Sequence, residues 1–194
     1  MLVTLALFLQ LAVAGVLLAS GVAKVRGDAN RETWKALLDR VPGLLGRLPV
    51  DVVSSLHIGV EILLAVALLV AIAPPLAPVA APALAAAALM FTGFTGIALY
   101  SATGAAVTCS CFGRSTTSLG WPHVVRNVAL TVLAVGGLVA ASDAVADPLP
   151  DLGSAALAVV GAAAVTALTY FFDDVVDVFA PLDPRRSGTR VPTR

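Results

Sequence analysis

Two cysteines separated by one serine are the residues of this chain best suited to redox chemistry. Cys109 and Cys111 lie in the segment Thr-Cys-Ser-Cys-Phe-Gly (108–113) and are the only cysteines of the sequence. In a bent segment, residues two apart can reach the Cα separation of about 4.4–6.8 Å that a disulfide needs. The small ring would be strained, and strained disulfides are the exchangeable kind. The pair predicts an exchangeable dithiol or, as the alternative, two small buried side chains at a turn.

A glutamate inside a long apolar segment is the second group that could do chemistry. His57 and Glu61 lie in the first half of the apolar residues 52–72 and are four positions apart, so they share one face of a helix. At about 1.5 Å per residue, Glu61 would lie roughly 14 Å into a membrane. An acid at that depth is costly unless it is protonated or paired, which favours a functional role. The alternative is a structural hydrogen bond between helices.

Three further residues could support such chemistry because they flank apolar segments. Lys24 closes the first segment, while His123 and Arg126 open the fourth. A nearby cation favours the thiolate, the reactive form of cysteine. A tetrahedral metal site would need four ligands, and the spacing of the four candidates matches no zinc finger or ribbon, so we expect no metal. These candidates are Cys109, Cys111, His57 and His123.

The composition places these residues in a membrane protein. Of 194 residues, 59% are hydrophobic and only 12% are charged, whereas soluble domains are about 25% charged. The formal net charge is zero, which gives no indication of nucleic-acid binding. We therefore expect an all-α, polytopic membrane helix bundle with membrane lipid as its surroundings.

Five apolar segments are long enough to cross a bilayer as helices of about 20 residues. They are residues 2–23, 52–72, 82–102, 124–141 and 152–172. The first four form a predicted four-helix domain (1–141), and the fifth follows a loop (142–172). A surface helix with one apolar face is predicted at about 29–48, and residues 173–194 are predicted to be a disordered tail. Ala88, Thr92 and Gly96 form a stripe of small residues that predicts close helix packing.

The basic residues are distributed on one side of this topology. Six lie in or beside the first loop, two lie around the third loop and four lie in the tail, which accounts for all twelve. The positive-inside rule then places the N-terminus outside the plasma membrane and the C-terminus in the cytoplasm. The same alternation places all the candidate residues in one leaflet. They are Lys24, His57, Glu61, Cys109, Cys111, His123 and Arg126.

Four features together resemble the MauE family of methylamine-utilisation membrane proteins. They are Ser-Gly-Val-Ala-Lys (20–24), Glu61, Cys-Ser-Cys-Phe-Gly (109–113) and Trp-Pro-His-Val-Val-Arg-Asn (121–127). The resemblance covers roughly residues 1–141 and leaves out the fifth span and the tail. It implies a DoxX-like four-helix fold, with Cys109 and Cys111 as a redox pair. It also implies maturation of the disulfide-rich small subunit of methylamine dehydrogenase, alongside a thioredoxin-like partner.

Three functions stay open at this point. The leading one is a thiol–disulfide oxidoreductase-like accessory protein that supports a disulfide-containing client. A non-enzymatic membrane subunit and a bundle that binds a quinone or another small molecule around Glu61 are the alternatives. One conflict accompanies the leading function, because oxidative maturation takes place outside the cytoplasm, whereas the basic residues predict that Cys109 and Cys111 face the cytoplasm.

Overall fold

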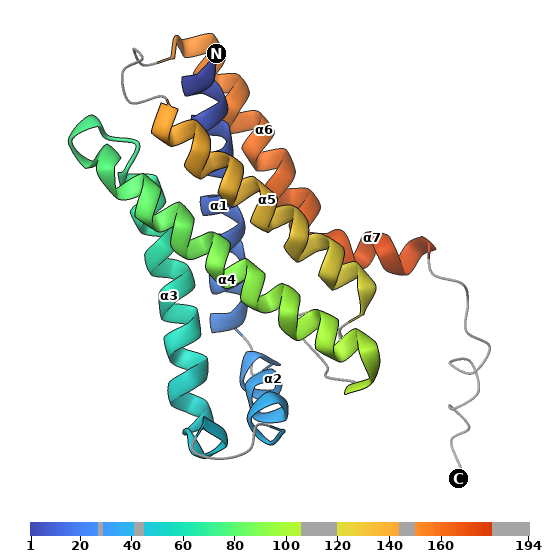
Figure 1. Ribbon diagram of the computed structural model, residues 1–194. Helices are drawn as coiled ribbons and strands as arrows, with labels where there is room; N and C mark the ends of the chain where they lie inside the picture. The colour runs from blue at the N-terminus through green and yellow to red at the C-terminus, as the bar shows by residue number, and fades with distance from the viewer. Residues whose placement is uncertain (27–28, 41–44, 106–119, 144–149, 180–194) are drawn as a thin grey trace.

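The computed structural model describes residues 1–26, 29–40, 45–105, 120–143 and 150–179 (Figure 1). These residues form helices and helical turns and contain no strand, so the all-α prediction is confirmed. Five of the helices are long and apolar enough to cross a membrane. They are α1 (Leu2–Val25), α3 (Val50–Val70), α4 (Ala80–Tyr100), α5 (Trp121–Asp143) and α6 (Leu152–Tyr170).

The helix ends follow from local chemistry. Pro49 precedes α3 in an extended conformation, and the proline-rich turn η2 (Pro74–Val79) separates α3 from α4, because proline cannot continue a helix. Asp151 caps α6. The Ser154 hydroxyl and the backbone N–H groups of Ser154 and Gly153 donate to its carboxylate and hold its pKa below the usual value.

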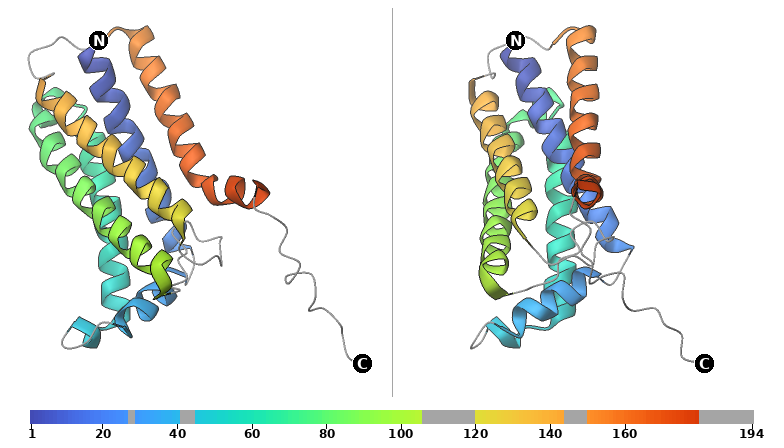
Figure 2. Two further views of the ribbon diagram at one scale, coloured as in Figure 1. Left: turned by 45° about the vertical axis from the view of Figure 1, so that its right-hand side comes forward. Right: turned by 90° about the vertical axis from the view of Figure 1, so that its right-hand side faces the viewer.

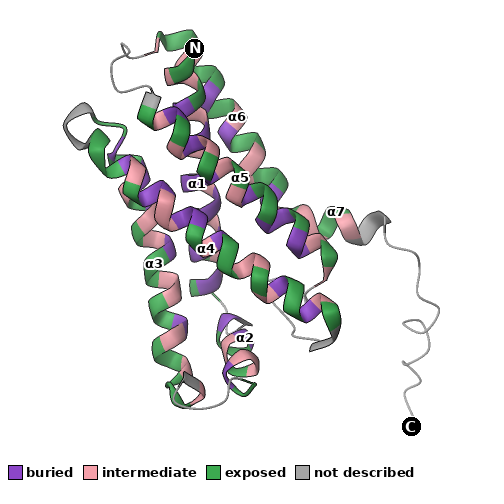
Figure 3. Cartoon of the chain, in the orientation of Figure 1, coloured by how far each residue is buried: buried purple, intermediate pink, exposed green. Residues whose placement is uncertain are grey.

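Helix α1 is the centre of the bundle and packs against α3, α5 and α6, while α4 packs along α5 (Figures 1 and 2). The main core lies where α1, α3, α4 and α5 meet. Its largest fully buried side chains are Val13, Leu17, Leu68 and Leu84. The outward faces of the helices are exposed (Figure 3). They carry apolar residues such as Leu63, Val132 and Val160, which are about two-thirds exposed. Such an exterior suits lipid and is unsuited to water.

Close helix packing occurs at glycines other than the predicted stripe. A Cβ atom added at Gly161 of α6 would lie 3.0 Å from the Phe8 ring of α1, and one at Gly137 would lie 3.2 Å from Leu84. By contrast, Thr92 is exposed, and a Cβ at Gly96 would have nothing within 4 Å. The stripe prediction was wrong for these two residues because that face of α4 points away from its neighbours.

Two short helices lie at the end of the bundle where α1 ends and α5 begins (Figure 2). Helix α2 (Ala29–Leu38) packs on α3 and is followed by the turn η1 (Leu45–Arg47). It is shorter than the predicted surface helix 29–48. Helix α7 (Phe172–Phe179) continues from α6. The sequence placed residues 173–179 in a disordered tail, and the structure instead gives them a helix with one strongly apolar face.

Candidate functional site

A buried ion pair joins α1 to α3. Lys24 Nζ lies 2.6 Å from Glu61 Oε1, and the two side chains are 4% and 3% exposed. Ser20, one turn before Lys24, donates its hydroxyl to both carboxylate oxygens at 3.2 and 3.4 Å. The Phe94 ring of α4 lies 5.7 Å from Lys24 Nζ, within reach of a cation–π attraction. Glu61 therefore has a complete set of partners inside the bundle.

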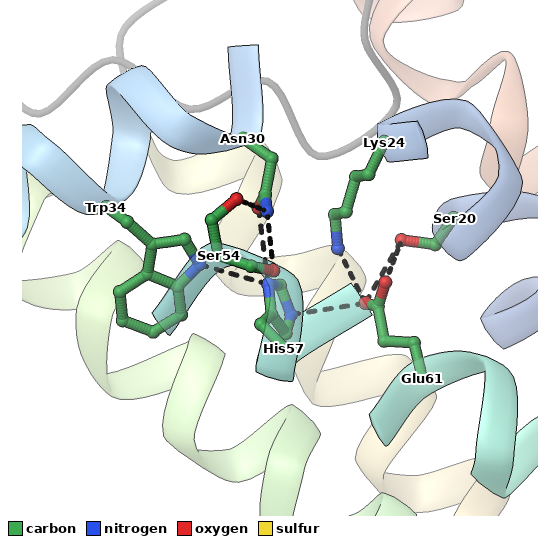
Figure 4. A network of polar contacts seen from close by, with 7 residues as sticks. All are labelled: Ser20, Lys24, Asn30, Trp34, Ser54, His57 and Glu61. Atoms are coloured by element: carbon green, nitrogen blue, oxygen red, sulfur yellow. Dashed lines mark hydrogen bonds and ion pairs between the residues drawn. The ribbon is translucent and has the colours of Figure 1, made fainter. Parts of the chain in front are cut away.

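His57 extends this pair toward α2 (Figure 4). Its Nε2 lies 3.4 Å from Glu61 Oε1, one helical turn along α3. The Trp34 indole N–H donates to its Nδ1 at 3.1 Å, and Asn30 Oδ1 lies 3.2 Å from the same nitrogen. Asn30 also donates to Ser54 of α3. Helix α2 thus covers the histidine and connects the end of the bundle to the ion pair.

A small internal cavity lies on the other side of the ion pair. Lys24 and Glu61 line it together with Arg126 and Asn127 of α5, and its volume is about 20 Å³. A cavity needs about 10–15 Å³ to hold one water molecule with polar partners. The cavity therefore has room for a single water between the α1–α3 ion pair and the polar start of α5.

A second acid, Asp173 of α7, pairs with the start of α5. Arg126 Nη1 lies 3.3 Å from Asp173 Oδ2 of α7, and His123 Nδ1 lies 3.7 Å from Asp173 Oδ1. Arg126 and His123 are 4% and 5% exposed and Asp173 is 16% exposed. The two cations Lys24 and Arg126 are thus matched by two acids, Glu61 and Asp173. We use the name polar cluster for these two cations, the two acids and the polar residues around them. Its members are Ser20, Lys24, Asn30, Trp34, Ser54, His57, Glu61, His123, Arg126, Asn127 and Asp173.

The candidate residues that the structure describes lie together at one end of the bundle. Lys24 and His57 each contact Glu61, and Arg126 lines the same cavity as Glu61. His123 is joined to them through Asp173 and Arg126. Cys109 and Cys111 lie outside the described residues. Within the described part of the chain, no group of three or more His, Cys, Asp and Glu residues is arranged to hold a metal ion.

Sequence reasoning missed several members of the polar cluster. Trp34 and Asn30 lie on α2. The sequence pattern predicted a helix there, but it did not predict that this helix packs against His57. Ser20 and Asn127 lie inside two of the segments that carry the family resemblance, which was the available signal. Asp173 lies where a disordered tail was predicted, and no local pattern singled it out.

The comparisons with known proteins agree with this picture over the first four spans. The family model for methylamine utilisation protein MauE matches residues 2–140. Comparison with curated proteins gave no match, and comparison with solved structures gave none either. The matched region contains α1 to α4, most of α5 and the segment with both cysteines, and it stops before α6 and α7. The chain is therefore a multi-pass membrane protein that belongs to the MauE family.

Proposed function

We propose that this membrane protein supports the thiol–disulfide chemistry of a partner protein through Cys109 and Cys111. The observation that carries the proposal is the family match over residues 2–140, which contains the cysteine pair together with most of the polar cluster. By resemblance to MauE proteins, the partner is a thioredoxin-like protein, and the client is a disulfide-rich subunit. The methylamine system of the family is one such client.

The connection of the cysteine segment to the bundle supports this role. Residues 106–119 join the end of α4 to the start of α5, and both helix ends pack together with α2. Ala98 and Val124 are the buried residues of this contact, with Leu37 of α2 against them. Cys109 is four residues beyond Ala105, so an extended chain carries it at most about 14 Å from that residue. The cations Lys24 and Arg126 belong to the same end of the bundle.

The proposed exchange conserves atoms and electrons. A thiolate of the Cys109–Cys111 dithiol attacks a disulfide sulfur of the thioredoxin-like partner and forms a mixed disulfide, and one partner sulfur leaves as a thiolate and takes a proton. The second cysteine then attacks the mixed disulfide, which yields the Cys109–Cys111 disulfide and the reduced partner. The reverse sequence reduces the pair. A cation such as Lys24 or Arg126 would favour the attacking thiolates by electrostatic attraction.

Serine variants test this proposal. If the two cysteines act as one unit, the variants Cys109→Ser and Cys111→Ser and the double variant lose client maturation to similar extents, because residues that act together are not additive. Each single variant should also trap a mixed disulfide with the partner, visible as a band that disappears on reduction. Full client maturation in the double variant would contradict the proposal and favour a non-enzymatic membrane subunit.

A further inference from the structure

The orientation of the Asn30 amide is fixed by its neighbours on α3. Its nitrogen donates to the Ser54 hydroxyl at 2.7 Å and to the Ser54 carbonyl oxygen at 3.3 Å. A carbonyl oxygen only accepts hydrogen bonds, so the nitrogen of Asn30 must face Ser54. Its Oδ1 therefore faces His57, 3.2 Å from Nδ1 (Figure 4).

The second neighbour of His57 Nδ1 has the opposite character. An indole N–H can only donate, and that of Trp34 points at Nδ1 from 3.1 Å. One ring nitrogen thus faces a fixed donor and a fixed acceptor at nearly the same distance. A bare Nδ1 is satisfied by Trp34, and a protonated Nδ1 is satisfied by Asn30. On the other side of the ring, Nε2 lies 3.4 Å from Glu61 Oε1, at ion-pair distance but without the geometry of a hydrogen bond.

We propose that His57 is a proton-binding site with two built-in states. In the neutral state, the hydrogen is on Nε2, the ring nitrogen on the side of Glu61, while Nδ1 accepts from Trp34. In the charged state, a hydronium ion gives one proton to Nδ1, which then donates to Asn30 Oδ1, and the hydrogen on Nε2 stays in place. The Nδ1–H bond forms as one O–H bond of the hydronium ion breaks, and the hydronium ion becomes a water molecule. Asn30 and Trp34 are positioning residues that stabilise the two states in turn.

The charges around His57 are compatible with both states. Glu61 on α3 is the nearest acid, and Lys24 on α1 pairs with it. Helix α4 contributes the Phe94 ring, 5.0 Å from the imidazole and edge-on. Arg126 of α5 lines the cavity beyond Glu61, where Asp173 of α7 is its partner. The exposed pair Arg31–Asp51 joins α2 to α3 at the surface.

His57 is the least buried member of the His57–Glu61–Lys24 group. Its side chain is 10% exposed, unlike Glu61 at 3%. It borders a groove of about 340 Å³ between α2, α3 and α4, whose other walls are apolar.

Nitrogen-15 NMR of the full chain in lipid nanodiscs tests the proposal without any substitution at His57. The chain has two histidines and two tryptophans, so the variants His123→Gln and Trp121→Phe assign the signals. At high pH, we expect hydrogen on Nε2 and a bare Nδ1, and at low pH hydrogen on both. The indole signal of Trp34 should shift with the same midpoint, and that of Trp121 should not. A neutral form with its hydrogen on Nδ1 would overturn the proposal.

Two variants should move the midpoint of this titration in opposite directions. Trp34→Phe removes the donor that stabilises a bare Nδ1, so protonation should move to higher pH. Asn30→Leu removes the acceptor that stabilises a protonated Nδ1, so protonation should move to lower pH. Each shift should be about 0.5–1 pH unit, the effect of one hydrogen bond. Trp121→Phe, at an exposed residue of α5, is the matched control and should leave the midpoint unchanged. Shifts of the same sign, or no shift in either variant, would overturn the proposal.

Discussion

Lys24 Nζ and Glu61 Oε1 lie 2.6 Å apart although 37 residues separate them in the chain, and both side chains are almost fully buried. This contact ties the end of α1 to the middle of α3. An acid inside an apolar helix is costly alone, and a buried pair is tolerated only with good geometry and further hydrogen bonds. Ser20 and His57 complete those contacts to Glu61. The ion pair is therefore the organising element of the polar cluster.

The first prediction is that each partner of this ion pair depends on the other for stability. Lys24→Met or Glu61→Gln leaves one buried charge without its counterion and should destabilise the fold by about 3–5 kcal/mol. The double variant Lys24→Met/Glu61→Gln removes both charges and should recover most of that loss. Thermal unfolding in detergent measures all three. Additive losses in the double variant would show that the two charges do not interact.

The double variant also separates structure from function. Because it should remain folded, its activity tests the ion pair without the complication of unfolding. We expect client maturation to fall, since the pair holds His57 and the cavity in place. A double variant that is stable and fully active would mean that the pair contributes only to packing.

The second prediction is that Asp173 holds α7 against the start of α5. Asp173→Asn removes the charge that faces Arg126 and His123, so the backbone amides of α7 should exchange with deuterium faster. Asp174→Asn is the matched control, because Asp174 is the adjacent acid and is exposed. Hydrogen–deuterium exchange followed by mass spectrometry gives the comparison. Equal exchange rates in the two variants would rule out the Asp173 contact.

The third prediction concerns the packing of α6 on α1. Replacing glycine by alanine in a helix adds stability of about 1 kcal/mol where there is space. At Gly161 the new methyl group would press on the rigid Phe8 ring, and such overpacking costs about 1–3 kcal/mol. Gly161→Ala should therefore lower the unfolding temperature, and Gly96→Ala, into open space, should not. A higher unfolding temperature in both variants would show that α6 does not pack this closely on α1.

The fourth prediction is the side of the membrane that the cysteine segment faces. From the one-sided basic residues we expect Cys111 to face the cytoplasm. In a Cys109→Ser background, a membrane-impermeant thiol reagent should leave Cys111 unlabelled in intact cells and label it after lysis. A Leu152→Cys variant, at the exposed start of α6 on the opposite side of the bundle, should be labelled from outside once Cys111 is also replaced by serine. Labelling of Cys111 in intact cells would reverse the orientation and favour an oxidative role outside the cytoplasm.

The five long helices were predictable because long runs of apolar residues have few other stable structures in a membrane protein. Their ends differ from the predictions by a few residues, as at Trp121, where α5 starts earlier than expected. The contact between His57 and Glu61 was also predictable, since four positions along a helix bring side chains together. The sequence predicted that Glu61 and Lys24 share a leaflet, but it did not predict that they pair. Their pairing depends on how α1 and α3 are rotated about their axes.

Other parts of the site could not be predicted from local patterns. Trp34 and Asn30 reach His57 only because α2 folds back onto α3, and that direction is set by tertiary packing. Asp173 belongs to a short acidic segment near the end of the chain, and composition favoured disorder there. Its role follows from contact with Arg126 of α5, which lies 47 positions earlier in the sequence.

Redox titration of the purified protein tests the central proposal most directly. The protein is equilibrated in buffers of increasing reduction potential, and its free thiols are then counted by alkylation and mass spectrometry. We predict one reversible transition from a form with two free thiols to a form with none. Its slope should be about 30 mV per tenfold change in the ratio of oxidised to reduced protein, as a two-electron couple requires. Cys109→Ser and Cys111→Ser should each abolish it. Two thiols that persist across the whole range would contradict a redox role for Cys109 and Cys111.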